Sequence, residues 1–169
     1  MIDYSKSIGY VETGIMQDDE PSFQDRVKEL ITGWLEPEFS LKNLPPGPDV
    51  RWVLQAHDGS RHVTVCSLQR AGDHVLLEGA VGLSDTHIAK INAMSAPERH
   101  DWLYQLRLDL TAMGLDFGGI EKSAPKRIHV QQHVYVDGGL SKDSFMQRLH
   151  AIRHGVAFVQ FTIQQRLGG

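Results

Sequence analysis

The sequence predicts an α+β domain in which helices pack on an antiparallel sheet of about five strands. Two segments, 50–81 and 126–136, carry apolar residues in alternation, which is the pattern of half-buried strands. Asp58-Gly59 is a two-residue hairpin signal, and a hairpin joins antiparallel neighbours. Apolar residues at helical spacing precede, separate and follow these segments. The expected order is therefore one helix, three strands, one or two helices, two strands and a long helix.

Size and composition fit a single globular domain. The chain has 169 residues, of which 41% are hydrophobic and 22% are charged, and such values are ordinary for one domain. Residues 1–20 lack clear periodicity and end in an acidic run, so we interpret them as a loosely ordered N-terminal arm. Residues 21–169 are predicted to form the single α+β domain.

The first helix is predicted between Pro21 and Pro37. Proline suits the first turn of a helix because its missing N–H would have no partner there, and a later proline ends the helix. The residues between them form one apolar stripe: Phe23, Val27, Leu30, Ile31, Trp34 and Leu35. Segment 37–48 is rich in proline and is predicted to be a connecting loop.

The expected strands fall into two groups. Three form a meander from Val50 to Val81, with turns at Asp58-Gly59 and at 71–73. The other two are a weak strand at 115–121 and a strong one at 126–136. One face of the strong strand is apolar: Ile128, Val130, Val134 and Val136. Its other face is polar: Arg127, His129, Gln131, His133 and Tyr135.

Capping residues mark the remaining helices. Ser84 or Asp85 can begin a short helix. The capping box Ser95-Ala96-Pro97-Glu98 begins a second helix, which ends near Gly114. A turn at 137–139 precedes Ser141, the expected cap of the last helix.

The last helix carries more apolar surface than packing on one sheet requires. One stripe follows its whole length: Phe145, Leu149, Ile152, Val156, Val159, Ile163 and Leu167. A second set lies on roughly the opposite side: Ala157, Phe158 and Phe161, flanked by His150 and His154. A helix with two apolar faces needs a second partner. We predict that this second set contacts another element of the chain, a second subunit or a protein client.

Two pairs of histidines are spaced four residues apart. His150 and His154 share a helical face, which is zinc-ligand spacing. No Cys, Glu or third His stands near them in the sequence, although Asp143 lies two turns earlier on a similar side. His129 and His133 lie on a strand and are roughly 13 Å apart, too far for one ion. We therefore expect no metal site and no cofactor. His129, His133 and Tyr135 are the candidates for a ligand pocket, because histidine exchanges protons near neutral pH.

No motif in the sequence indicates a catalytic residue. Cys66 is predicted to be a small buried hydrophobe, since a nucleophilic cysteine needs a lowered pKa and an adjacent base. The triplet 116–118 (Asp-Phe-Gly) matches the metal-holding triplet of protein kinases, but no glycine-rich phosphate loop accompanies it, so its glycine is expected in a turn. Scattered arginines are interpreted as solvated surface: Arg51, Arg61, Arg70 and Arg99.

Charge and targeting signals limit the partners. The formal net charge of −4 disfavours a nucleic-acid-binding surface. The sequence has no run of 18 apolar residues and no N-terminal basic segment followed by an apolar run, so neither a membrane span nor a signal peptide is expected. A single cysteine is typical of a reducing compartment. These features predict a cytoplasmic protein with no membrane or nucleic-acid partner.

Several short motifs lie between residues 82 and 167. They are Gly82-Leu83-Ser84, Ser95-Ala96-Pro97-Glu98-Arg99, Leu106-Arg107-Leu108-Asp109-Leu110, Gly114-Leu115-Asp116-Phe117, Tyr135-Val136-Asp137-Gly138 and Leu140-Ser141-Lys142-Asp143-Ser144-Phe145-Met146. This set looks like an uncharacterised prokaryotic family, the domain of unknown function family 2299. The order of elements also resembles the fold of the type III secretion chaperones. Over 21–81 only that order and the Asp58-Gly59 hairpin agree.

This resemblance implies a fold and no activity, because the family has none established. Members of the wider chaperone fold are small, acidic and often homodimeric, and they bind extended segments of client proteins. We therefore expect a homodimeric protein-binding module, chaperone-like or an adaptor, without catalytic activity. The alternative is a small enzyme or ligand-binding domain with a pocket lined by His129, His133 and Tyr135.

Overall fold

The structure is a computed structural model that describes residues 22–70, 72–120, 125–136 and 140–168. The predicted arm at 1–20 and the predicted turn at 137–139 lie outside these residues. The described elements in chain order are α1 (Phe23–Leu35), β1 (Ser40–Leu44), β2 (Val50–Asp58), β3 (Arg61–Leu68), β4 (His74–Gly82), α2 (Asp85–Ala93), α3 (Ala96–Ala112), β5 (Asp116–Gly118), β6 (Arg127–Tyr135) and α4 (Lys142–Leu167). This order confirms the predicted α+β class.

The described strands form one sheet of six strands in the order β1-β2-β3-β4-β6-β5, and every neighbouring pair is antiparallel. The prediction of about five strands missed β1. The prediction of a loop over 37–48 was wrong for this strand, because its prolines flank Ser40–Leu44 without interrupting it. β1 lies at the edge of the sheet and needs only β2 as a partner.

The β2–β3 hairpin turns one residue later than the sequence predicts. Asp58 pairs with Arg61, so the two-residue loop is Gly59-Ser60. Gly59 has φ +60°, and no described non-glycine residue has a positive φ. A positive φ at the first loop position alone is the type II′ pattern, whereas a type I′ turn requires a positive φ at both loop positions.

The predicted caps begin the described helices. Ser95 and Glu98 form the expected capping box at the start of α3, and Ser84 caps α2. Ser141 accepts a hydrogen bond from the Ser144 backbone N–H at the start of α4. Each serine satisfies a backbone N–H that has no partner inside the helix.

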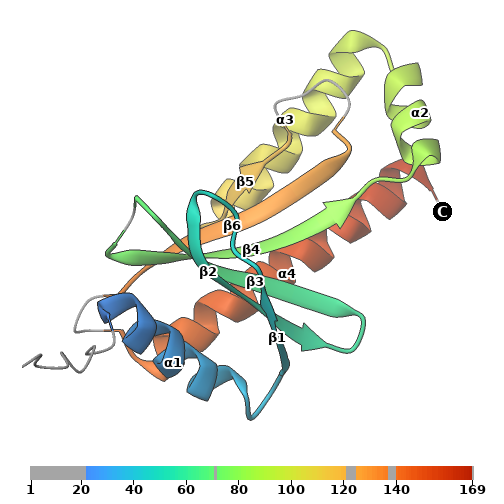
Figure 1. Cartoon of the computed structure of the whole chain (residues 1–169). Coiled ribbons are helices and arrows are strands. Elements are labelled where there is room, and N and C mark those ends of the chain that lie inside the picture. The colour runs from blue at the N-terminus through green and yellow to red at the C-terminus, as the bar shows by residue number, and fades with distance from the viewer. Residues whose placement is uncertain (1–21, 71, 121–124, 137–139, 169) are drawn as a thin grey trace, which may run out of the picture.

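α4 packs along one face of the sheet, against β3, β4 and β6 (Figure 1). Its predicted stripe is buried except for the half-buried Val156. α1 lies beside the start of α4, where the rings of Trp34 and Phe145 are 5.5 Å apart. α2 lies beside its end, where Lys90 Nζ donates a hydrogen bond to the Leu167 carbonyl. The segment 156–163 is helical, as its spacing predicts.

α1 and α3 pack on the same side of the sheet as α4. The buried Gln24 of α1 accepts a hydrogen bond from the Ser67 hydroxyl of β3 at 2.7 Å. α3 contributes Leu110, which lies near Gly155 of α4. The four described helices share one continuous core with this face of the sheet. The domain therefore has two layers, and the opposite face of the sheet has no helix layer among the described residues.

Candidate functional site

The face of the sheet that is turned away from α4 is the candidate functional surface, and we name it the open face. Side chains alternate between the two faces of a strand. On β4, Val75, Leu77 and Val81 belong to the core, so the residues between them belong to the open face. The open-face residues of β6 begin at Arg127 and end at Tyr135, whose side chain is 63% exposed.

One continuous polar row crosses the open face on all six strands. The paired residues from β1 to β5 are, in order, Lys42, Gln55, Thr64, Glu78, Gln131 and Asp116. Gln131 Nε2 donates a hydrogen bond to Glu78 Oε2 at 2.6 Å, so the middle of the row is already ordered. A cationic residue stands at one end of this polar row and an acidic residue at the other.

A second row beside it is largely apolar. Its paired residues from β1 to β6 are Leu44, Val53, Cys66, Leu76 and His133. None of the four apolar members of this row belongs to the core cluster beneath the sheet. The apolar row therefore gives the open face a hydrophobic strip that the helices do not use.

Five histidines lie in or beside these rows. The rings of His57 and His62 are 5.3 Å apart, and those of His74 and His133 are 4.8 Å apart. His129 Nδ1 lies 3.1 Å from Glu78 Oε1 without the geometry of a hydrogen bond. The imidazoles pair with different neighbours at separate places, so they form no single catalytic cluster.

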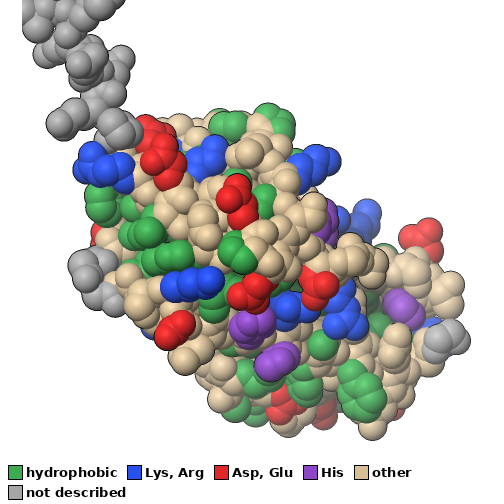
Figure 2. Space-filling view, turned by 90° about the horizontal axis from the view of Figure 1, so that it is seen from below, with side chains coloured by type: hydrophobic (Ala, Val, Ile, Leu, Met, Phe, Trp, Pro, Cys, Tyr) green, Lys and Arg blue, Asp and Glu red, His purple; other side chains and the backbone are tan. Residues whose placement is uncertain are grey.

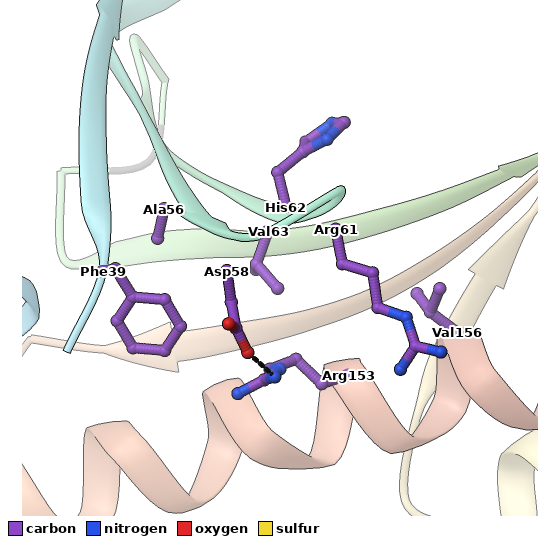
Figure 3. Close-up of a pocket in the computed structure, with 8 residues that line it drawn as sticks. All are labelled: Phe39, Ala56, Asp58, Arg61, His62, Val63, Arg153 and Val156. Atoms are coloured by element: carbon purple, nitrogen blue, oxygen red, sulfur yellow. Dashed lines mark hydrogen bonds and ion pairs between the residues drawn. The ribbon is translucent and has the colours of Figure 1, made fainter.

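A cavity lies on the other side of the sheet, between the β2–β3 hairpin and α4. It is partly open to solvent and has room, about 20 Å³, for little more than one water molecule. Figure 3 shows Arg61 and Asp58 directed from the hairpin towards α4, whereas His62 points away. Asp58 forms an ion pair with Arg153 of α4. This cavity and the open face are therefore separate surfaces.

Cys66 lies in the apolar row and is 8% exposed. Burial raises the pKa of its thiol to about 11, and the Glu78 carboxylate adds to the rise. A thiol with this pKa stays protonated near neutral pH and is a poor nucleophile. This agrees with the predicted interpretation of Cys66 as a small buried hydrophobe.

Alkylation of Cys66 should therefore be slow in the folded protein. The rise of its pKa from 9.0 to about 11 is expected to slow the reaction with iodoacetamide at pH 8 about 100-fold relative to the urea-unfolded chain. The rate in the folded protein should still climb above pH 9, because most of the thiol is protonated there. A rate that levels off near pH 9 would contradict this assignment.

Residues 27–163 match the sequence profile of a family described as "Uncharacterized conserved protein (DUF2299)". The chain belongs to this family. The predicted membership is thereby confirmed over most of the chain, including the part before residue 82. The search of curated proteins found no match.

Two solved structures resemble this DUF2299 chain. A crystal structure of an uncharacterized protein from Methanothermobacter thermautotrophicus is 24% identical, with a TM-score of 0.75, and the match covers 83% of this chain and 99% of that one. It shows the fold alone. YbjN from E. coli is 11% identical, and the match covers 82% of this chain and 89% of that one. Its TM-score of 0.42 is too low to support an argument about function. The likeness to type III secretion chaperones stays a prediction.

The candidates on α4 have unequal exposure. Phe161 is 63% exposed, and His154 is also exposed. Ala157 and His150 are half-buried, and the half-buried Phe158 packs against the core. The second apolar side of α4 is thus narrower than the sequence suggests, with Phe161 as its main exposed group. Its role as an interface stays a prediction.

The candidates for a ligand pocket share one face, as predicted, but lie along an open strand. His133 and Tyr135 both contact His74, with ring centroids 4.8 and 5.5 Å apart. His129 instead contacts Glu78. The cavity beside α4 is lined by other residues. These three residues therefore lie on an open surface, and their role in binding a ligand stays a prediction.

The described residues also bear on metal, membrane and nucleic-acid partners. Within the described ranges, no three His, Cys, Asp or Glu side chains are grouped so that they could hold a metal ion. No described helix is long and apolar enough to span a membrane. In the view from below, acidic and basic side chains are interspersed (Figure 2). The expectation that nucleic acid is not a partner stays a prediction.

Arg61, which the sequence predicts to be solvated surface, is exposed and also lines the cavity beside α4. It precedes Val63 by two residues and shares its face of β3. Strand alternation therefore directs Arg61 towards α4, where Arg153 also lies (Figure 3). The period-two pattern was sufficient to place Arg61 on this side, although its cavity requires α4 in position.

Proposed function

We propose that the protein is a non-catalytic protein-binding module whose first partner is a second copy of itself, bound through the open face. The observation that carries this proposal is the polar row. When a second copy faces it with its strands in reversed order, each residue of the row meets a complementary residue. It begins with Lys42, ends with Asp116 and crosses all six strands. An isologous dimer requires a self-complementary surface of this kind.

The complementarity follows from a two-fold axis parallel to the strands, between β3 and β4. Such an axis reverses the order of strands in the facing copy, because β1 then lies over β5 and β2 over β6. In the polar row this places Lys42 opposite Asp116, Gln55 opposite Gln131, and Thr64 opposite Glu78. Each pair matches a donor with an acceptor or opposite charges. Sheets that pack face to face in this way are about 10 Å apart.

The apolar row supports the same arrangement. The same axis places Cys66 opposite Leu76 near the centre of the interface. Neither residue belongs to the core cluster beneath the sheet. Cys66 is only 8% exposed, so the half-buried Leu76 supplies most of the apolar surface that the two copies would bury at this point. The open face carries Lys42 and Arg127 against Glu78 and Asp116. The formal charges of these four paired residues balance, which limits the repulsion between two copies.

A charge swap tests the proposed dimer. Lys42→Glu should raise the dimer Kd by about tenfold or more, because it places a carboxylate opposite Asp116 of the other copy. Asp116→Lys alone should weaken association similarly. The double variant K42E/D116K should restore most of the affinity, because the charges are complementary again. Sedimentation velocity over a range of concentrations measures each Kd.

Lys28→Glu on α1 is the matched control, since it makes the same charge change away from the open face. It should leave the dimer Kd within about threefold of the original. Circular dichroism should show that all variants remain folded. A wild-type protein that stays monomeric at ~100 µM, or a double variant as weak as K42E, would contradict the proposal.

The outer side of α4 is the proposed contact for a protein client. Phe161 is 63% exposed, and His154 lies two helical turns away on the same helix. Aromatic residues, phenylalanine among them, are enriched in protein–protein interfaces. The resemblance to type III secretion chaperones, whose relatives bind extended client segments, supports the same assignment. In this arrangement the dimer and the client use different sides of the domain.

A further inference from the structure

The edge strand β1 lies next to α1, and an open groove runs between them (Figure 1). The groove has room of about 620 Å³, and its lining comes from Asn43 of β1 and from one side of α1 between Asp25 and Glu36. Gly33, in the middle of that side, has no atom close to the position that a Cβ would take. The groove can therefore hold side chains of a segment that lies along β1.

The backbone of β1 has unused hydrogen-bonding groups beside this groove. Along an antiparallel strand, successive residues bond alternately to one neighbour and to the other. The two-residue β2–β3 hairpin fixes this alternation, because Asp58 and Arg61 close it as a hydrogen-bonded pair. Gln55 and its alternates in β2 therefore bond to β1. The N–H and C=O groups of Leu41 and Asn43 consequently point away from β2, and no described strand pairs with that side.

The groove carries an excess of negative charge. Three carboxylates line it, those of Asp25, Glu29 and Glu36, against the single ammonium group of Lys28. Glu29 and Glu36 are exposed and form no ion pair with a described residue. Hydrogen bonds from Ser22 lower the pKa of Asp25, so this carboxylate is also ionised at neutral pH. A segment that carries positive charge is therefore favoured in the groove.

Charge also distinguishes between the possible occupants of this edge. A second copy paired through β1 would bring its own acidic groove, and the two grooves would repel each other. The strand is short and has prolines on both sides, which further disfavours pairing between copies. Residues 1–20 of the chain are themselves acidic, with Lys6 as the only cation against Asp3, Glu12, Asp18, Asp19 and Glu20.

We propose that an extended, basic segment of a partner protein adds to the sheet as a strand along β1, with lysine or arginine side chains facing Glu29 and Glu36. The main-chain groups of Leu41 and Asn43 hold such a segment, and every second side chain of the segment is directed towards the groove. This inference names a partner class for the protein-binding module proposed above. It uses neither the open face nor the outer side of α4.

A seven-residue peptide in which lysine and valine alternate, acetylated and amidated at its ends, is the probe. NMR titration of the ¹⁵N-labelled full chain should show saturable shifts at the backbone amides of Leu41 and Asn43, with a Kd on the order of 0.1–1 mM at low salt. Two control peptides should bind at least about tenfold more weakly. One has glutamate in place of lysine, and the other has the same side chains on an N-methylated backbone.

Matched variants separate the charge of the groove from the net charge of the protein. Glu29→Gln combined with Glu36→Gln should weaken binding of the lysine peptide about tenfold, and Lys28→Gln should strengthen it about threefold. Asp101→Asn combined with Asp109→Asn, on α3, removes the same charge elsewhere and should leave the Kd within about twofold. Opposite effects from E29Q/E36Q and K28Q are not expected from a general loss of structure.

Hydrogen exchange of the free protein tests whether the edge is available. The amides of Leu41 and Asn43 should exchange rapidly without the peptide and more slowly when it is bound. Slow exchange in the free protein, the absence of saturable shifts, equal binding of either control peptide, or equal loss in the two double variants would overturn the proposal. The dimer is measured separately by sedimentation, so a peptide that fails to bind would leave the proposed dimer unaffected.

Discussion

Replacement of Phe145 by alanine is expected to lower the free energy of unfolding by about 3–5 kcal/mol. The Phe145 side chain is fully buried in the first turns of α4 and contacts the ring of Trp34 on α1. Its removal leaves a cavity where α1 and α4 meet, and the rigid elements around the cavity can close it only in part. Urea unfolding at one fixed protein concentration measures the loss.

Phe161→Ala is the matched control on the same helix. Phe161 is 63% exposed, so its truncation should change the free energy of unfolding by no more than about 0.5 kcal/mol. It should also leave the dimer Kd unchanged, because the proposed dimer uses the other side of the domain. Dissociation by F161A together with no effect from K42E would instead place the dimer interface on α4.

The helices and most strands were predictable because their signals are local. Serine caps and the proline before α1 mark helix starts, and the period of the apolar residues separates helix from strand. The sequence pattern does not predict strand β1, because only Leu41 and Leu44 of its five residues are apolar and prolines flank it. An edge strand with one partner requires little hydrophobic patterning, so its existence depends on β2.

The open face could be predicted only in part. Alternation along β6 correctly separated the polar from the apolar side chains, including His129, His133 and Tyr135. The sequence alone does not reveal which strands are neighbours, and β6 pairs with β4 across two intervening helices and β5. The polar row joins residues from all six strands. Whether it is complementary to the same row of a second copy can be judged only when the strand order is known.

The apolar surplus on α4 has a related explanation. Phe158 packs against the core from a position that a helical projection assigns to the outer side. α4 is covered by α2 and α3 as well as by the sheet, so its buried arc is wider than that of a helix on a flat sheet. The prediction allowed another element of the chain as a partner of the second apolar face, and Phe158 does pack against the core of its own domain.

Gly79→Val is expected to lower the free energy of unfolding by about 3 kcal/mol, because α4 lies directly on this part of β4. A Cβ atom at Gly79 would lie 2.4 Å from Val156 Cγ2 and 3.1 Å from Ile152 Cγ2. Both neighbours are β-branched and have little rotamer freedom in a helix, so α4 itself would have to shift. Urea unfolding measures this loss of stability.

Gly82→Val is the control at the end of the same strand, where a Cβ atom would meet nothing within 4 Å. It should be neutral or slightly stabilising, since valine favours strands. Val156→Ala removes the closest clashing methyl and should recover at least about half of the loss in the G79V/V156A double variant. Equal losses from G79V and G82V would show that glycine is needed for backbone freedom rather than for the approach of α4. If the close approach of α4 is the cause, G79V should lose much more unfolding free energy than G82V, and V156A on the helix should restore part of that loss.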